Sequence, residues 1–134
     1  MRTLTDHIVD GDQAVQLEIE VIDEPGAGGA NHHYAISGFE SEGNPSAPSH
    51  FDGLDYKELH VVFQNGPIKE SGVNGITQEV LLAIVIDRLN GFQGGPYASP
   101  FNASALDHCR SALRVLQTRT RERLARGVEG THTI

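Results

Sequence analysis

The chain has 134 residues and a formal net charge of −8, with 38% hydrophobic and 21% charged residues. This length and composition are typical of one globular domain with its own core, and the negative charge argues against duplex DNA or an anionic membrane as the main partner. The single Cys109 cannot form an internal disulfide, which favours a reducing compartment, and neither a secretion signal nor a membrane span is expected.

The first half of the chain has the alternating pattern of β-strands. In VQLEIEVID, residues 15–23, every second side chain from 15 to 21 is apolar, which predicts a half-buried strand. The apolar set is Val15, Leu17, Ile19 and Val21. HYAISGF (33–39) and YKELHVVFQ (56–64) predict two further strands, because turns rich in Gly and Pro separate them. A small antiparallel sheet is therefore expected.

The second half predicts two helices joined by a short turn. Apolar side chains recur at helical spacing through residues 74–93, with Asn74 or Thr77 as the expected N-cap. The second helix is expected to begin at Pro100, since proline is favoured at the first helical position, and to continue to Arg126.

The second helix carries a narrow apolar seam, which consists of Leu106, Cys109, Leu113, Leu116 and Leu124. Both helices therefore have apolar stripes, and one small sheet offers too little surface to cover both, which predicts a symmetric homo-oligomer formed through the helices. The expected fold class is α+β. It has an N-terminal antiparallel sheet (1–72) and an antiparallel two-helix hairpin (73–134) in one integrated domain.

Six of the ten cationic residues are arginines of the second helix, namely Arg110, Arg114, Arg119, Arg121, Arg123 and Arg126. At about 100° per residue they form two stripes, one on each flank of the apolar seam. In one interpretation, these long side chains border a buried seam and extend to water. In the other, Arg119 and Arg123 grip phosphate oxygens, because they lie one turn apart beside the seam.

The sequence predicts neither a catalytic site nor a metal site. Four candidate histidines lack metal-ligand spacing and are expected to lie exposed in loops. They are His32, His33, His50 and His60. Cys109 follows His108, but neighbouring helical side chains point about 100° apart, so Cys109 is expected to be a small core residue. Glu122 and Glu129 are expected to be solvated rather than an acid–base pair.

Two segments, FQNGPIKESGVNGITQEVLLAIVIDRLNGFQGGPY and RTRERLARGVEGT, resemble the first-described family of phage Thoeris anti-defence sponges. That family shares its helical hairpin with phage anti-CBASS nucleotide sponges. The resemblance spans residues 63–131, about half of the chain. It implies a small sheet joined to two helices, assembled as a dimer or hexamer, with no cofactor and no enzymatic activity.

The resemblance also implies a function. Such a protein sequesters glycocyclic ADP-ribose, the cyclic ADP-ribose isomer that bacterial Thoeris TIR proteins make, without cleaving it. It acts in the cytoplasm of the infected bacterial host, where its partners are this signal and further copies of itself. Neither a membrane nor duplex nucleic acid is an expected partner.

By the same resemblance, Phe92 in GFQGG stacks on the ligand base and Asn102 makes polar contacts. Arg119 and Arg123 in RTRER bind the pyrophosphate, and Phe101 is a rival for the stacking role. Arg123 lies about 30 Å along the second helix from the hairpin turn. One chain can therefore hardly bring these residues together, and a site at the subunit interface is expected.

Two alternatives stay open. The protein could be a sponge for CBASS cyclic oligonucleotides, alone or in addition, with further ligand contacts from the remaining arginines Arg110, Arg114, Arg121 and Arg126. It could also be a module that only oligomerises. Substituting Arg119 separates these classes, because the loss of that side chain abolishes ligand binding in a sponge and changes only stability in an oligomerisation module.

Overall fold

The computed structural model describes residues 1–53 and 55–134, and the side chains of all of these except residues 14 and 15. The chain divides into two compact units, a sheet unit (Met1–Asn65) and a hairpin unit (Gly66–Ile134). The short segment 66–72, which the sequence analysis grouped with the sheet, belongs to the hairpin unit.

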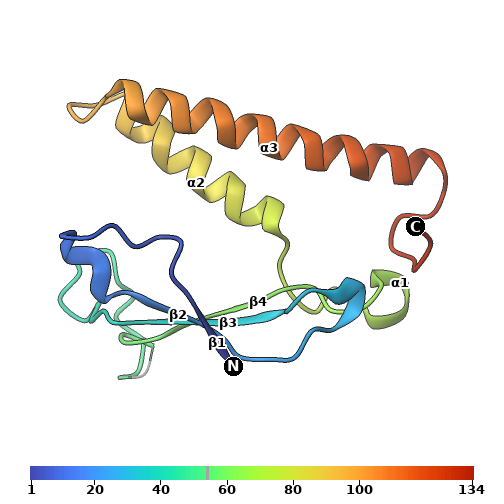
Figure 1. Cartoon of the computed structure of the whole chain (residues 1–134), viewed down its shortest axis with the longest axis horizontal. Helices are drawn as coiled ribbons and strands as arrows, with labels where there is room; N and C mark the ends of the chain where they lie inside the picture. Colours follow the sequence, from blue (N-terminus) through green and yellow to red (C-terminus); the bar gives the residue numbers. More distant parts are fainter. Residues whose placement is uncertain (54) are drawn as a thin grey trace. The chain divides into compact units, whose positions relative to one another are not determined.

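The sheet unit contains a four-stranded antiparallel sheet in the order β1-β2-β3-β4 (Figure 1). The strands are β1 (Arg2–Leu4), β2 (Glu18–Val21), β3 (His33–Ser37) and β4 (Leu59–Val62). The predicted antiparallel sheet is confirmed, but the strand expected at 15–23 is shorter, because the 3-10 helix η1 (Gln13–Gln16) occupies its first residues. The side chain of Val15 lies outside the described part. β1 was not predicted, since three residues are too few to show an alternating pattern.

Strand register places one buried apolar side chain on each face of the sheet. Val21 pairs with Tyr34 and is 1% exposed, whereas Ala35, on the opposite face from Tyr34, is 7% exposed. The ring of Tyr34 packs edge-to-face on that of Phe63, with centroids 5.7 Å apart. The sheet is thus held by cross-strand pairs and a thin apolar layer.

The connection from β2 to β3, which includes the 3-10 helix η2 (Ala27–Gly29), is anchored by the carboxylate of Asp23. It accepts hydrogen bonds from the backbone amides of His32 (3.0 Å) and His33 (3.1 Å). Partial burial raises the pKa of the Asp23 carboxyl, but these hydrogen bonds lower it more, so the pKa lies below its ordinary value. The ionised carboxylate therefore stabilises the start of β3.

The hairpin unit contains a short helix and two long ones, α1 (Ile68–Ser71), α2 (Gln78–Gln93) and α3 (Pro100–Ala125). Thr77 is the N-cap of α2, where its side chain accepts from the Val80 amide (3.3 Å). The N-cap of α3 is Ser99, which accepts from the Asn102 amide (3.0 Å). The two predicted helices are confirmed, with α3 ending one residue earlier because Arg126 is its C-cap.

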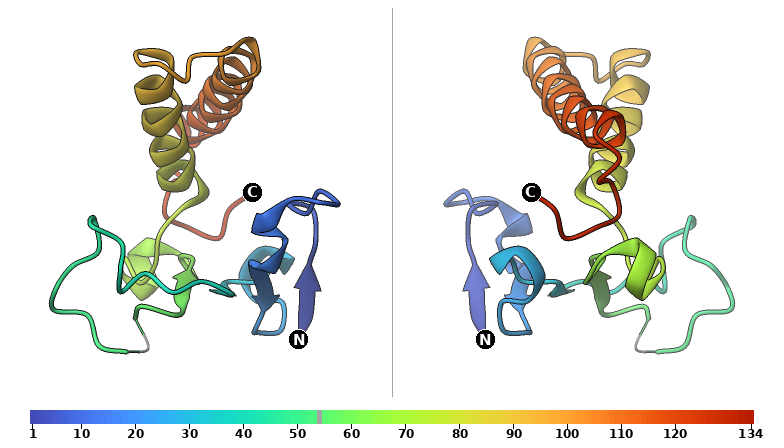
Figure 2. Two further views of the ribbon diagram at one scale, coloured as in Figure 1. Left: turned by 90° about the vertical axis from the view of Figure 1, so that its left-hand side faces the viewer. Right: turned by 90° about the vertical axis from the view of Figure 1, so that its right-hand side faces the viewer.

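The helices α2 and α3 run in opposite directions from the turn and lie side by side near it (Figures 1 and 2). Leu106 of α3 is buried, and the seam members Cys109, Leu113 and Leu116 are half-buried. Leu124, the last member of the predicted seam, is 61% exposed in the single chain. The half-buried positions continue in steps of four and three to Thr120 and Arg123 instead.

None of the helices in the described part of the chain combines the length and the apolar character that a membrane span needs.

Candidate ligand-binding site

Phe92, the predicted stacking residue, lies on the last turn of α2 and is 39% exposed. The guanidinium carbon of Arg88 lies 5.5 Å from the centre of its ring, in a cation–π contact. Arg88 was not among the residues predicted from the sequence, although its spacing of four residues from Phe92 on a helix places the two side chains together. The turn end of the hairpin thus offers an aromatic ring with a cation beside it.

Asn102, predicted for polar contacts, is half-buried and helps to order the hairpin turn. Its Nδ2 donates to the Tyr97 carbonyl (3.1 Å), and its backbone amide donates to Ser99 Oγ (3.0 Å). The Ser99 amide in turn donates to Gln93 Oε1 (2.9 Å), which ties the turn to the end of α2. Phe101, the rival stacking residue, is 86% exposed.

The guanidinium of Arg123, which was predicted to bind pyrophosphate, makes four hydrogen bonds within its own chain. Its Nε donates to Glu129 Oε2 (3.0 Å) and its Nη1 to the Thr133 carbonyl (2.6 Å). Its Nη2 donates to the carbonyls of Val128 (3.0 Å) and Thr131 (3.3 Å). Only 11% of the side chain is exposed. Arginine has five N–H donors, so one, on Nη1, remains for a ligand.

Two further arginines also have protein partners. Arg110 donates through Nη2 to Asn90 Oδ1 (2.9 Å), which links α3 to α2. Arg126 pairs with Glu122 (2.5 Å) and donates to the Ile134 carbonyl (2.7 Å). These contacts agree with the interpretation that some of the arginines border the packed helices and support them.

The other three arginines of α3 are uncommitted. In the part of the chain that the structure describes, the guanidinium groups of Arg114, Arg119 and Arg121 have no hydrogen-bond or ion-pair partner, and all three residues are exposed. Arg119 and Arg123 lie one turn apart but differ in the N–H donors that they can offer to a ligand. Arg119 has all five donors free, whereas Arg123 has one. The sequence alone gave both the same role.

The predicted site residues fall into two groups. Phe92 and Asn102 flank the hairpin turn, whereas Arg119 and Arg123 lie toward the other end of α3. Asn102 and Arg119 are 17 residues apart on one continuous helix, which corresponds to about 25 Å. One chain does not bring these groups to a common ligand.

The expectation of exposed loop histidines is confirmed for His50, which lies exposed in a turn, and is wrong for the other three. His32 is buried, with 7% of its surface exposed. His33 and His60 lie on the adjacent strands β3 and β4, with His33 Nε2 2.7 Å from His60 Nδ1. The other nitrogen of His60 lies 3.1 Å from Glu58 Oε1. Among the described residues, no group of three or more His, Cys, Asp or Glu side chains is arranged so that it could hold a metal ion.

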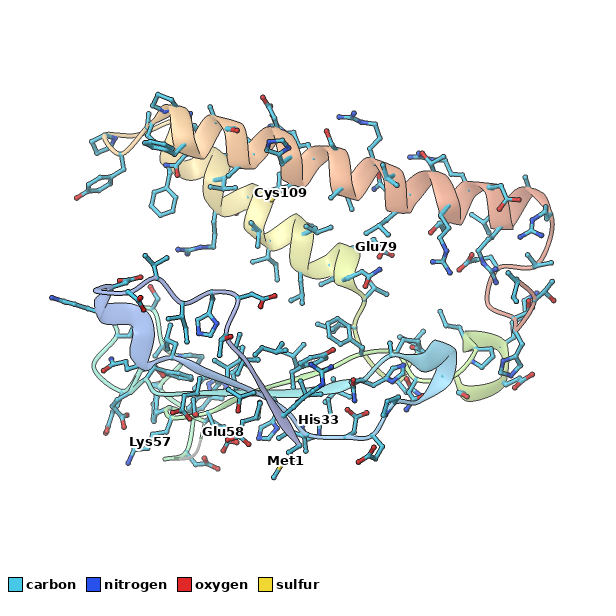
Figure 3. The ribbon with its side chains drawn as sticks, viewed as in Figure 1. Met1, His33, Lys57, Glu58, Glu79 and Cys109 are labelled. Atoms are coloured by element: carbon cyan, nitrogen blue, oxygen red, sulfur yellow. The ribbon has the colours of Figure 1, made fainter. Side chains whose placement is uncertain are left out.

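Two pairs of residues were considered as catalytic candidates, Cys109 with His108 and Glu122 with Glu129. Cys109 on α3 (Figure 3) is half-buried, whereas the side chain of its neighbour His108 is exposed to solvent. Glu122 and Glu129 do not face one another as an acid–base pair, since they bind Arg126 and Arg123 respectively.

Comparisons with known proteins agree with this focus on the hairpin. Residues 55–121, half of the chain, match the model of a family described as "Acb2/Tad1, hairpin domain". The match includes Phe92, Asn102 and Arg119 and ends two residues before Arg123. A protein named "Thoeris anti-defense 1", from Bacillus phage SBSphiJ7, is 49% identical over 72 residues, which cover 54% of this chain and 51% of that protein. The chain thus spans about half the length of this relative. By its hairpin, the chain belongs to the Acb2/Tad1 hairpin family.

Proposed function

We propose that this protein is a phage anti-defence sponge that binds a cyclic ADP-ribose isomer, glycocyclic ADP-ribose, and holds it without cleavage in the cytoplasm of the infected bacterium. The relationship to a protein named for anti-Thoeris activity supports this proposal. The observation that carries it is the uncommitted guanidinium of Arg119 at one end of a hairpin whose other end exposes the Phe92 ring.

The two ends supply complementary chemistry for such a ligand. Stacking of an adenine base on Phe92 contributes about 1–3 kcal/mol. Arg119, whose five donors are free, provides the bidentate grip on the pyrophosphate, and Arg123 adds its one remaining Nη1–H. A polar contact comes from Asn102, through the carboxamide oxygen left free when Nδ2 binds Tyr97.

The site forms between copies of the chain in this proposal, because about 25 Å separates its two halves within one chain. An antiparallel second hairpin places the turn of one copy beside the arginines of the other. The surface of α2 supports this, since the helix has no buried residue and several of its apolar side chains are exposed, including Val80 (46%), Ile84 (54%) and Val85 (42%). Residues 80–86 of this helix are all apolar, and a helix segment that is apolar on all sides is normally covered.

A sponge must act by affinity, because it does not turn over. Nanomolar binding corresponds to about −12 kcal/mol, which one phosphate contact cannot supply. Stacking, several charge-assisted hydrogen bonds and a preorganised interface together can reach it.

Calorimetric titration with glycocyclic ADP-ribose and its isomers tests this function, followed by assay of the ligand released from heat-denatured protein. Tight binding with recovery of intact ligand is expected. Recovery of an opened product would identify an enzyme, and absence of heat with every isomer would contradict the proposed ligand class.

Two single-arginine variants sharpen the test. Arg119→Ala should abolish binding and leave the oligomeric state, measured by light scattering, unchanged. Arg121→Ala is the matched control, since Arg121 is also exposed and uncommitted, and it should bind as the wild type does. Equal loss in both variants would mean that the overall charge of α3 matters rather than a defined site.

Sponging of CBASS cyclic oligonucleotides, alone or in addition, is a second candidate. The observation that favours it is the pair of uncommitted arginines on the other flank of α3, Arg114 and Arg121. Titration with cyclic trinucleotides tests it. Loss of trinucleotide binding in Arg121→Ala, with retained binding of the ADP-ribose isomer, would establish two separate sites.

A further inference from the structure

The chain beyond α3, residues 127–134, forms a hook that returns to α1 (Figure 1). Gly127, with φ of 71°, ends α3 with hydrogen bonds from its own amide to the Leu124 carbonyl and from the Val128 amide to the Arg123 carbonyl (both 3.0 Å). This is the double hydrogen-bond pattern of a Schellman C-cap. The direction of the hook is therefore set by the backbone at the helix end.

The far part of the hook is held by α1. The Gly130 carbonyl accepts from the Lys69 amide (3.2 Å), and His132 Nε2 lies 3.1 Å from Glu70 Oε2. The Thr131 hydroxyl also donates to the Val128 carbonyl. The segment that carries the carbonyl oxygens receiving Arg123 is thus held by contacts that do not depend on Arg123.

Glu129 is the one charged partner of Arg123 in the described part of the chain. Its carboxylate takes the Nε donor, whereas the hook carbonyls take Nη1 and Nη2. The donor that stays free is on Nη1. A phosphate oxygen that binds there does not have to displace Glu129. The carboxylate therefore orients the guanidinium without competing for the same donor.

We infer that the hook is part of the ligand-binding site and that Glu129 is a positioning residue, which holds the Arg123 guanidinium in its binding orientation before the ligand arrives. This inference rests on the proposed function. A mobile arginine loses side-chain freedom when it binds a phosphate, whereas an arginine fixed in advance does not. Preorganisation of one such side chain corresponds to roughly 2- to 10-fold in Kd.

Two substitutions separate geometry from charge. Glu129→Gln removes the charge but keeps an acceptor oxygen at the same distance from the backbone. Glu129→Asp keeps the charge, but its side chain is one methylene shorter, so the carboxylate moves away from Arg123 Nε. If Glu129 acts by position, Glu129→Asp should weaken binding of glycocyclic ADP-ribose roughly 2- to 10-fold, and Glu129→Gln should stay within about 2-fold of the wild type. If it acted by charge, the order would reverse.

The matched control is Glu122→Gln, which removes the same charge from the end of α3. Glu122 pairs with Arg126 at the surface, where the two side chains are 56% and 45% exposed, so its loss should leave Kd unchanged. All variants are titrated as the full chain by calorimetry, with the oligomeric state measured in parallel. Any change that Glu129→Gln shares with Glu122→Gln is then assigned to net charge.

The outcomes distinguish the inference from the function on which it rests. Wild-type binding with an unchanged Kd for Glu129→Asp overturns the positioning role and leaves the sponge intact. Tighter binding by Glu129→Gln than by Glu122→Gln also overturns it, because Glu129 would then compete with the ligand. Absence of wild-type binding removes the proposed function and the inference together.

Discussion

Two arginines one turn apart on α3 should differ in how much the same substitution lowers the stability of the protein. Arg119 is exposed and uncommitted in the described part of the chain, whereas the Arg123 side chain is 11% exposed and makes four hydrogen bonds. Arg119→Ala and Arg123→Ala remove the same atoms, the same charge and the same helix propensity. Because Arg123 also lies in the last turn of α3, where the helix dipole favours a cation by about 0.3–1 kcal/mol, a larger difference in stability between the variants comes from tertiary contacts.

The expected difference follows from the contacts of Arg123. Each intramolecular hydrogen bond contributes about 1 kcal/mol net, so four give an upper value of about 4 kcal/mol. The carboxylate of Glu129 is 35% exposed, so water can replace part of the lost interaction. Arg123→Ala should therefore destabilise the hairpin unit by about 2–3 kcal/mol, whereas Arg119→Ala should remain within about 0.5 kcal/mol of the wild type.

Urea unfolding followed by helix circular dichroism measures both variants. The protein concentration is kept constant, because the stability of an oligomer depends on it. A loss of 2 kcal/mol or more in Arg123→Ala alone supports the contacts described here. Equal unfolding free energies for the two variants would refute the assignment of Arg123 to the hook, since the substitution would then have removed nothing that the folded state needs.

Two predictions concern the ends of secondary-structure elements. Because the folded-state pKa of Asp23 lies below its ordinary value of 3.8, its carboxylate stabilises the fold above that value, and the stabilisation is lost as the pH falls through the lowered pKa. Asp23→Asn should lower stability at pH 7 and flatten its decline in acid, as measured by urea unfolding from pH 2 to 7. An unchanged acid profile would exclude this role. Ser99→Ala should cost about 1 kcal/mol by removing the N-cap of α3, in thermal or urea unfolding. The control Ser104→Ala, at an exposed position inside α3, should cost nothing, and equal losses would contradict the cap.

The long helices could be predicted from the sequence because their signals are local. Thr77 and Ser99 are cap residues that need only the next turn of backbone, and Pro100 fits the first helical position wherever it occurs. The alternation around Ile19 and Val21 likewise predicts a strand without reference to its partners. β1 and α1 were missed, since three or four residues carry too little pattern.

Only the tertiary structure decided which of the arginines are available to a ligand. By helical phase, Arg119 and Arg123 are equivalent, and the sequence places both beside the seam. The hook decides between them, because its carbonyls and Glu129 surround one guanidinium and leave the other in water. Helical periodicity reports which face a side chain occupies. It does not report which groups reach that face from a segment beyond the end of the helix. Here that segment turns back at Gly127 and supplies the carbonyls and the carboxylate that bind Arg123.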